Sequence, residues 1–198
     1  MRRLCRYAVL AIVLAAVGVV GVVHAPVAAA LTIRGDSLWT ENPVCPAHWE
    51  QPEIAAGDWR PIPFPWQHIW PQDWPLDPAA RPFWGTSSFP QNCLRRVFEL
   101  VEVPTGAAIA HVWADDDYEF FLNGARIGAS ADSAGTMPGE SYDVAAHLRT
   151  GRNVVALRVT DIGGVMAALF SLEIPNVAVA AKGKVVVSYK VETENQIA

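Results

Sequence analysis

The sequence contains few lysines and few cysteines, and it has only one long apolar run. The low content of these features argues against several kinds of binding site. The chain contains three lysines, all between positions 182 and 190, and its formal net charge is −5. An acidic body without a basic stripe argues against nucleic acid as a partner. The sequence also lacks Cys-x-x-Cys and His-x-x-x-His spacings, a glycine-rich phosphate loop and a serine nucleophile elbow. Composition therefore supplies no motif for a transition metal, a nucleotide or acyl transfer.

The one long apolar run lies at the N-terminus. Three arginines precede an apolar stretch from Ala8 to Val23, and small residues continue to Ala30. This order is typical of a secretory signal, so we expect residues 1–30 to be a leader that is cut near Ala30. An uncleaved anchor is the alternative, because the apolar character extends to Leu31 and approaches the length of a membrane-spanning helix. We expect a secreted or cell-surface protein that contacts a membrane only if this segment is retained.

Two cysteines remain after the leader, Cys45 and Cys93. An even number of cysteines in an exported protein predicts a disulfide. Closing a loop of about fifty residues would contribute roughly 3–4.5 kcal/mol by the chain-entropy relation. Two buried thiols are the alternative interpretation.

Residues 31–93 are unusually rich in tryptophan and proline. Seven of the eight tryptophans lie between Trp39 and Pro90. Proline fixes φ and removes a backbone donor, which disfavours long helices and central strands. Disordered segments are poor in aromatics, whereas this one is rich in them. We therefore predict an irregular layer that wraps over a sheet and is held by tryptophan side chains.

The pattern changes to short strands from Leu94. Apolar and polar residues alternate in several runs up to Pro175, and Asn123-Gly124 separates two of these runs. An Asn-Gly pair between alternating segments is the strongest local hairpin signal, because a type I′ turn needs positive φ at both central positions. The spacing predicts an all-β fold, an antiparallel sandwich formed by residues 94–175. Residues 176–198 are predicted to form an additional β tail.

Three stretches together resemble a known module. These are CLRRVFELVEVP, AAIAHVWADDDYEFFLNGARIG and SYDVAAHLRTGRNVVALRVTD, preceded by WQHIWP. Their order resembles the galactose-binding-like jelly-roll domain that accompanies β-galactosidase-like and α-L-rhamnosidase-like glycoside hydrolases. The resemblance covers about residues 66–174 and implies a jelly-roll β-sandwich. The catalytic barrel of those enzymes is absent, so the resemblance implies a module that is not itself an enzyme, and a fold alone does not fix a function.

The aspartates of ADDDYEFF allow three interpretations. A catalytic pair must converge, but adjacent strand residues point to opposite faces, and no partner acid is identifiable. Asp115, Asp116 and Asp117 could alternatively hold a structural calcium ion, since Ca²⁺ takes several oxygen ligands. The third interpretation is that Asp115 and Asp116 accept backbone N–H bonds in the turn that starts the strand. We expect the third, with calcium as the alternative and no other cofactor.

The tryptophans are the remaining candidates for ligand contact. Sugar rings pack against flat aromatic faces, while a few polar groups supply directional hydrogen bonds. Tryptophans that only build a core are the alternative. The candidate glycan-binding residues are Trp66, Trp70, Trp74, Trp84, Asp73 and Asn92.

Two functions from different classes follow. The first is a non-catalytic carbohydrate-binding or cell-surface adhesion module whose partner is a glycan. The second is a structural subunit of a surface filament or envelope assembly, in which the tail pairs with a neighbouring surface protein or with a second copy of the chain. The candidate subunit contacts are Val185, Val187, Tyr189 and Val191.

Overall fold

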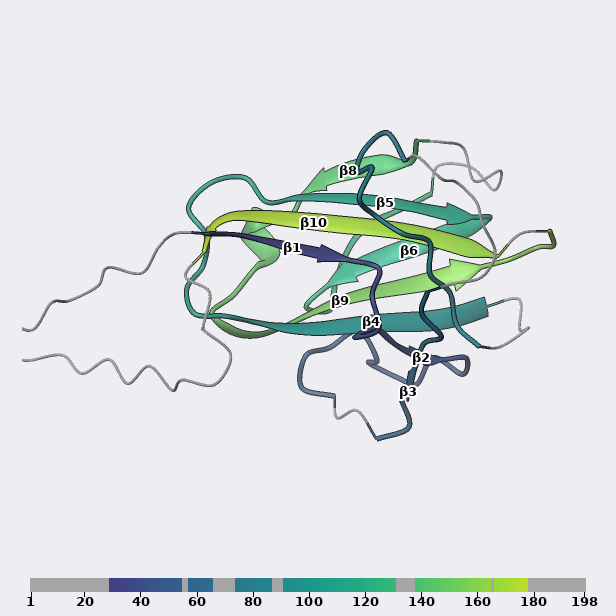
Figure 1. Cartoon of the computed structure of the whole chain (residues 1–198). Coiled ribbons are helices and arrows are strands. Elements are labelled where there is room, and N and C mark those ends of the chain that lie inside the picture. Colours follow the sequence, from purple (N-terminus) through teal and green to yellow (C-terminus); the bar gives the residue numbers. More distant parts are fainter. Residues whose placement is uncertain are drawn as a thin grey trace, which may run out of the picture.

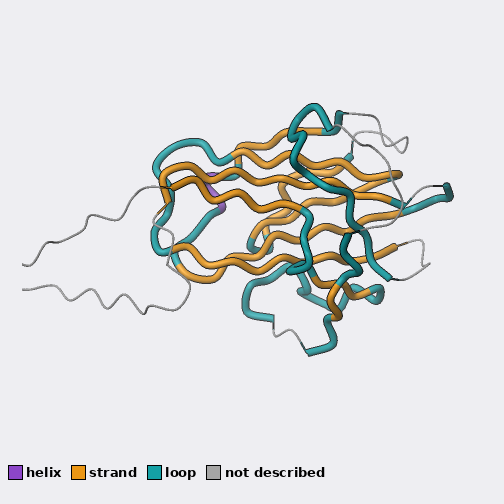
Figure 2. The backbone as a smooth tube through the Cα atoms, in the orientation of Figure 1, coloured by secondary structure: helices purple, strands orange, loops and turns teal. Residues whose placement is uncertain are grey.

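The computed structural model describes residues 29–54, 57–65, 74–86, 91–130, 138–164 and 166–177. Within them, ten strands and one short 3₁₀ turn, Ala145–His147, account for the regular structure (Figures 1 and 2). No described helix has the length and apolarity that a bilayer crossing needs. The strands are β1 (Ala29–Arg34), β2 (Thr40–Asn42), β3 (Arg60–Pro61), β4 (Gln91–Leu100), β5 (Ile109–Asp115), β6 (Asp117–Leu122), β7 (Ala125–Ala129), β8 (Glu140–Asp143), β9 (Gly151–Thr160) and β10 (Ala167–Val177).

The strands form two antiparallel sheets that pack face to face, as the sequence predicted. One sheet has the order β1-β10-β5-β8 and the other has the order β3-β2-β4-β9-β6-β7. From β4 onward the chain crosses repeatedly between the sheets and returns to the same sheet only at the β6–β7 hairpin (Figure 1). The fold is the predicted jelly-roll β-sandwich.

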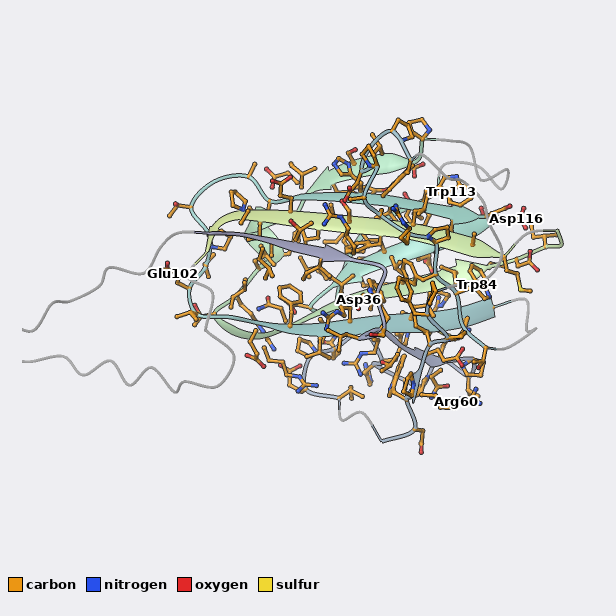
Figure 3. The ribbon with its side chains drawn as sticks, in the orientation of Figure 1. Asp36, Arg60, Trp84, Glu102, Trp113 and Asp116 are labelled. Atoms are coloured by element: carbon orange, nitrogen blue, oxygen red, sulfur yellow. A yellow bond between two sulfur atoms is a disulfide. The ribbon has the colours of Figure 1, made fainter. Side chains whose placement is uncertain are left out.

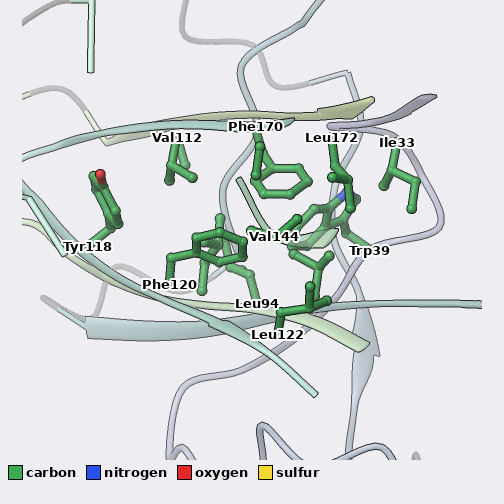
Figure 4. Packing of buried hydrophobic residues seen from close by; sticks show 14 of the residues in the cluster. Ile33, Trp39, Leu94, Val112, Tyr118, Phe120, Leu122, Val144, Phe170 and Leu172 are labelled. Carbon is green, nitrogen blue, oxygen red and sulfur yellow. The ribbon is translucent and has the colours of Figure 1, made fainter. Parts of the chain in front are cut away.

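The core lies between the two sheets and is built by alternate residues of each strand (Figure 4). Trp39 packs against Phe83 with ring centroids 4.7 Å apart, and its other ring neighbour is Phe170 at 5.4 Å. Phe120 meets Phe170 edge-on at 5.7 Å. Each of these rings is fully buried. Burial of a large apolar side chain contributes about 1.5–3 kcal/mol, so this aromatic cluster is a principal source of stability.

The Asn-Gly hairpin is confirmed. Asn123 and Gly124 have φ values of 52° and 85°, and they connect β6 to β7. The Asn123 side chain also receives a hydrogen bond from the Val154 backbone N–H and donates to the Asn153 side chain, both at 2.8 Å. Asn153 in turn bonds the backbone N–H of Arg149 at 3.0 Å and its carbonyl at 2.7 Å. Two asparagines therefore tie the hairpin to the turn that precedes β9.

The tryptophan- and proline-rich region contributes more regular structure than the sequence predicted. Strand β1 pairs with β10, and β2 and β3 extend the other sheet beside β4. The alternation in Leu31–Arg34 fits a strand, because Ile33 faces the core while Arg34 does not. The irregular parts cover both sheets: residues 43–54 and 57–59 lie on the outer face of the six-stranded sheet, and residues 74–80 lie on that of the four-stranded sheet. The irregular residues thus form one layer on the outer face of each sheet.

The predicted disulfide is confirmed. Cys45 and Cys93 are bonded, with their Cα atoms 5.4 Å apart. Cys93 lies on the outward face of β4, next to Arg158 of β9 in the sheet register. The bond therefore fastens the irregular segment 43–54 onto the centre of the six-stranded sheet.

Strand β10 continues past the proline that was expected to end it. Its register against β1 shifts between Leu31 and Ala29, so that Val177 pairs with Ala29. A bulge of this kind accommodates Pro175, which has no N–H to donate to the ladder. The pairing also means that the chain enters β1 and leaves β10 at the same end of the sandwich. The predicted leader up to residue 28 and the predicted tail from residue 178 lie outside the described residues.

Candidate functional site

Three of the predicted ligand-binding residues are interior side chains. Trp74 and Trp84 are 1% and 0% exposed, and Asn92 is fully buried. A sugar ring has no access to a face of either indole, so the expectation that these residues contact a glycan is corrected. Their role is packing: Trp74 covers Trp113 and Leu169 on the four-stranded sheet, and Trp84 belongs to the main core. Trp66, Trp70 and Asp73 lie outside the described residues.

Asn92 belongs to a buried polar cluster around Glu41. The Glu41 carboxylate accepts hydrogen bonds from the Asn92 side-chain amide at 2.8 Å, the Thr86 backbone N–H at 2.8 Å and the Thr86 hydroxyl. Glu41 is 0% exposed, and the exposed Arg60 approaches it at 3.8 Å. These donors satisfy a carboxylate that would otherwise be costly to bury. The cluster joins β2, β4 and Thr86, and the side chains at its centre, Glu41 and Asn92, are buried.

The aspartates do not form a metal site in the described residues, where no group of three or more potential ligands is arranged to hold an ion. Asp116, labelled in Figure 3, accepts a backbone N–H bond. The donor is Ile162 in the β9–β10 loop, at 2.5 Å. Asp117 accepts from the Ser130 hydroxyl at 3.0 Å. Burial raises the pKa of Asp115, and the charges of Asp116 and Asp161 add to this effect. Asp116 thus caps the backbone of a neighbouring loop and not, as predicted, the turn that starts its own strand.

The four predicted subunit contacts, Val185, Val187, Tyr189 and Val191, lie outside the described residues. What the described residues do show is the state of the sheet edges. Strands β7 and β8 each have a hydrogen-bonded neighbour on one side only. Among the described strands, they form the edges along one side of the sandwich.

An aromatic strip crosses the outer face of the six-stranded sheet. Trp49 lies at its centre, 3% exposed, and stacks on Trp59 with centroids 6.1 Å apart. On the other side Trp49 meets the edge of Phe121 at 5.7 Å. Trp59 and Phe121 both keep part of their surface exposed. Among the described tryptophans, Trp59 is the one that is not buried.

One ring of the aromatic strip, that of Trp59, packs on the guanidinium group of Arg95. The guanidinium of Arg95 lies 5.0 Å from the centroid of the Trp59 ring, a cation–π distance. Arg95 is 2% exposed and donates to the Gln51 carbonyl at 2.9 Å. Burial lowers the pKa of Arg95, and the nearby Arg152 charge acts in the same direction while Glu50 opposes it. The group nevertheless stays protonated, because an arginine is not deprotonated in proteins.

A group of three charged side chains borders Phe121. Glu119 of β6 accepts from Arg158 of β9 at 2.6 Å and from Arg126 of β7 at 3.1 Å. Glu119 lies two positions before Phe121 on the same face of β6, and Arg126 pairs directly with Phe121. These side chains are 31–56% exposed, so they reach solvent beside the aromatic strip. We call the whole surface the aromatic–arginine face; it comprises Trp49, Trp59, Phe121, Arg95, Arg158, Glu119 and Arg126.

The outer face of the other sheet carries a second polar cluster. His111 contacts the Ser141 hydroxyl through Nδ1 at 2.7 Å and lies edge-on to Trp74. Burial lowers the pKa of His111, although the charges of Asp77 and Glu173 oppose it. Asp77 is paired with Arg34 at 2.6 Å. Burial alone would raise the pKa of Asp77, but hydrogen bonds from Arg34, Ala79 and Ser171 lower it overall. This cluster fastens the segment 74–80 to its sheet.

Sequence reasoning missed Trp59, Phe121 and the arginines of the aromatic–arginine face. The alternation of β9 did place Arg158 on the same side as Val154 and Ala156. What it could not supply was the neighbour across the sheet. Glu119 and Arg158 become partners only through the register of β6 against β9.

No family model matches the sequence, and no curated protein matches it. Solved structures do match its fold. A β-glucuronidase from Bacteroides uniformis superposes with a TM-score of 0.50 at 16% identity, over 75% of this chain and 18% of that enzyme. A glycosyl hydrolase family 2 member from Bacteroides cellulosilyticus gives 0.51 at 18% identity, over 73% and 21%. An α-L-rhamnosidase from Streptomyces avermitilis gives 0.41 at 21% identity, over 48% and 10%.

The chain therefore spans about a fifth of the length of the two Bacteroides proteins. At these identities the likeness concerns the fold and not the activity. The family 2 neighbour is a glycoside hydrolase, the group of enzymes that the sequence resemblance had indicated. The protein shares the architecture of a β-sandwich domain found in glycoside hydrolases of family 2.

Proposed function

We propose that this protein is an exported, non-catalytic carbohydrate-binding module whose glycan lies on the aromatic–arginine face. The observation that carries the proposal is the aromatic strip, in which Trp59 and Phe121 retain exposed surface beside charged side chains. An apolar wall with a few convergent polar groups is the usual composition of a ligand site. Export follows from the predicted leader, and attachment to a cell surface would follow if that segment is retained.

The chemistry of the face suits a sugar ring. The C–H groups of a pyranose would pack on Trp59 or Phe121, since both rings are held by Trp49 and lose little freedom on binding. Hydroxyl groups of the sugar would exchange hydrogen bonds with Glu119 and Arg126, which already point to solvent. The absence of catalysis is part of the proposal and rests on the sequence, in which no converging pair of acids was identified.

The experiment is a binding measurement on the full-length chain against a glycan panel, followed by titration calorimetry with the best ligand. Trp59→Ala should weaken binding about tenfold, which corresponds to about 1.4 kcal/mol. Trp59→Phe keeps an aromatic face and should retain most of the affinity, and thermal melting of both variants controls for folding. Unchanged affinity in a folded Trp59→Ala variant would refute the site. Release of sugar from any panel member would refute the non-catalytic assignment.

A subunit of a surface assembly is the second candidate. The open edges of β7 and β8 favour it, because an exposed edge accepts a strand from a neighbouring chain. The predicted tail would supply that strand. Light scattering on the full-length chain and on a chain truncated after Ala181 separates the two functions: oligomers that disappear on truncation support assembly, whereas a monomer in both cases contradicts it.

A further inference from the structure

Positive charge is in excess on the aromatic–arginine face. Arg126 and Arg158 share one carboxylate, that of Glu119. Arg95 has no described carboxylate within the 4.0 Å that defines an ion pair. Three guanidinium groups are thus opposed by one paired carboxylate, in a chain whose formal net charge is −5.

Arginines elsewhere in the described residues are balanced differently. Four of them each have a carboxylate that no other described arginine shares; the pairs are Arg34–Asp77, Arg60–Glu41, Arg96–Asp36 and Arg149–Glu53. Only on the aromatic–arginine face do two described arginines converge on the same acid. Arg81 and Arg152 also lack a described carboxylate within 4.0 Å, so what distinguishes the aromatic–arginine face is that its two exposed arginines share one acid.

Two arginines of the aromatic–arginine face each have a hydrogen-bond donor that no protein group accepts. The Nε atoms of Arg95 and Arg158 are buried without a hydrogen-bond partner, as is that of Arg96 outside the face. A donor left without an acceptor in the interior is unfavourable, so each side chain uses only part of its hydrogen-bonding capacity, although Arg95 donates to the Gln51 carbonyl and Arg158 to Glu119. Both keep a charge directed toward the outer face: Arg95 lies beneath Trp59, and the Arg158 side chain is 36% exposed.

We infer that the ligand of this face is an acidic saccharide, a glycan that carries carboxylate or sulfate groups. Its anionic group would pair with the exposed Arg126 and Arg158, because a guanidinium matches the planar geometry of an oxyanion pair. Its ring would pack on Phe121, which Arg126 adjoins in the register. Arg95 is buried and would act through its charge rather than by contact. This inference rests on the proposed function and adds the ligand class to it.

The acidic neighbours limit the size of the positive region. Asp117 lies two positions before Glu119 on the same strand face, where the Ser130 hydroxyl bonds it. Glu50 lies near enough to Arg95 to affect its pKa. The positive region is consequently small and suits one anionic group on a sugar better than a dense polyanion.

The test compares matched ligands. Polygalacturonate and its fully methyl-esterified form share a backbone but differ in charge, and dextran sulfate and dextran repeat the comparison for sulfate. With the full-length chain we expect at least tenfold tighter binding to the charged member of one pair. Arg126→Gln should reduce that affinity about fivefold, while Glu119→Gln, which removes the single opposing carboxylate, should increase it about fivefold. Arg81→Gln is the matched control, since it removes one exposed charge outside the face.

The outcomes separate the inference from the function on which it rests. Equal binding of charged and neutral members, still dependent on Trp59, would overturn the acidic ligand and leave the glycan-binding function intact. No binding to any polymer or to the glycan panel would overturn both. Equal losses for Arg126→Gln and Arg81→Gln would show attraction by overall charge and would also overturn the inference. Opposite effects of Arg126→Gln and Glu119→Gln would support it, because unfolding weakens binding in both variants.

Discussion

Removal of the disulfide should be the most destabilising change that leaves the sheets intact. The Cys45–Cys93 bond closes a loop with a sequence separation of 48. The chain-entropy relation gives about 4 kcal/mol for a loop of this length. Cys93 is also fully buried beside Trp49, Val154 and Ala156, so its replacement by alanine leaves a small void that adds about 1 kcal/mol. The double variant Cys45→Ala, Cys93→Ala should lose about 5 kcal/mol in total.

Guanidinium denaturation measures this loss. Intrinsic tryptophan fluorescence is a suitable signal, because Trp49 and Trp59 lie on the segment that the disulfide fastens. The oxidised protein, the same protein in reducing agent and the double variant should be compared. The reduced protein keeps both sulfur atoms and should lose only the entropic part. A loss below about 1 kcal/mol in both the reduced protein and the double variant would refute the reasoning. It would mean that packing, and not chain closure, holds the irregular segment on the sheet.

Three further predictions concern other contacts. Asn153→Ala removes four hydrogen bonds of a fully buried side chain and should cost about 3 kcal/mol of unfolding free energy in urea titration; a cost below 1 kcal/mol would contradict a structural role. Gly85→Ala places a methyl group against the side chains of Asn92 and Glu41, and should lower the free energy of unfolding by at least about 2 kcal/mol. An unchanged melting temperature of this variant would contradict the prediction. Asp115 has a raised pKa, so its folded form holds the proton more tightly and stability falls as pH rises above the ordinary value of 3.8. Asp115→Asn should therefore raise the melting temperature at pH 7 and have no effect near pH 3, and a lower melting temperature at pH 7 would contradict this.

The sandwich could be predicted because its signals are local. Strand alternation in β9 and the Asn123-Gly124 turn depend on the dihedral preferences of a few neighbouring residues. The pairing of Cys45 with Cys93 followed from the count of cysteines left after the leader. In contrast, β1 was missed, since a six-residue strand at the edge of a proline-rich region is recognisable only when β10 is beside it.

The candidate site could not be predicted in the same way. Trp74 and Trp84 lie in the same proline-rich region as Trp59, and Trp74 and Trp59 each adjoin a charged residue. Their exposures differ because Trp74 is covered against the four-stranded sheet, whereas Trp59 lies at the margin of the layer on the opposite sheet. Which face a layer covers is decided by contacts between residues far apart in the chain.

By itself the sequence determined an all-β chain with one hairpin at Asn123-Gly124, one disulfide and a tryptophan-rich wrap, because backbone preference, alternation and residue counts are properties of short segments. Only the tertiary structure decided where charge and aromatic surface meet. Arg158, Glu119 and Arg126 come from three strands, and their grouping depends on sheet register. A shift of one residue in that register would turn these side chains toward the core, since alternate residues of a strand face opposite sides.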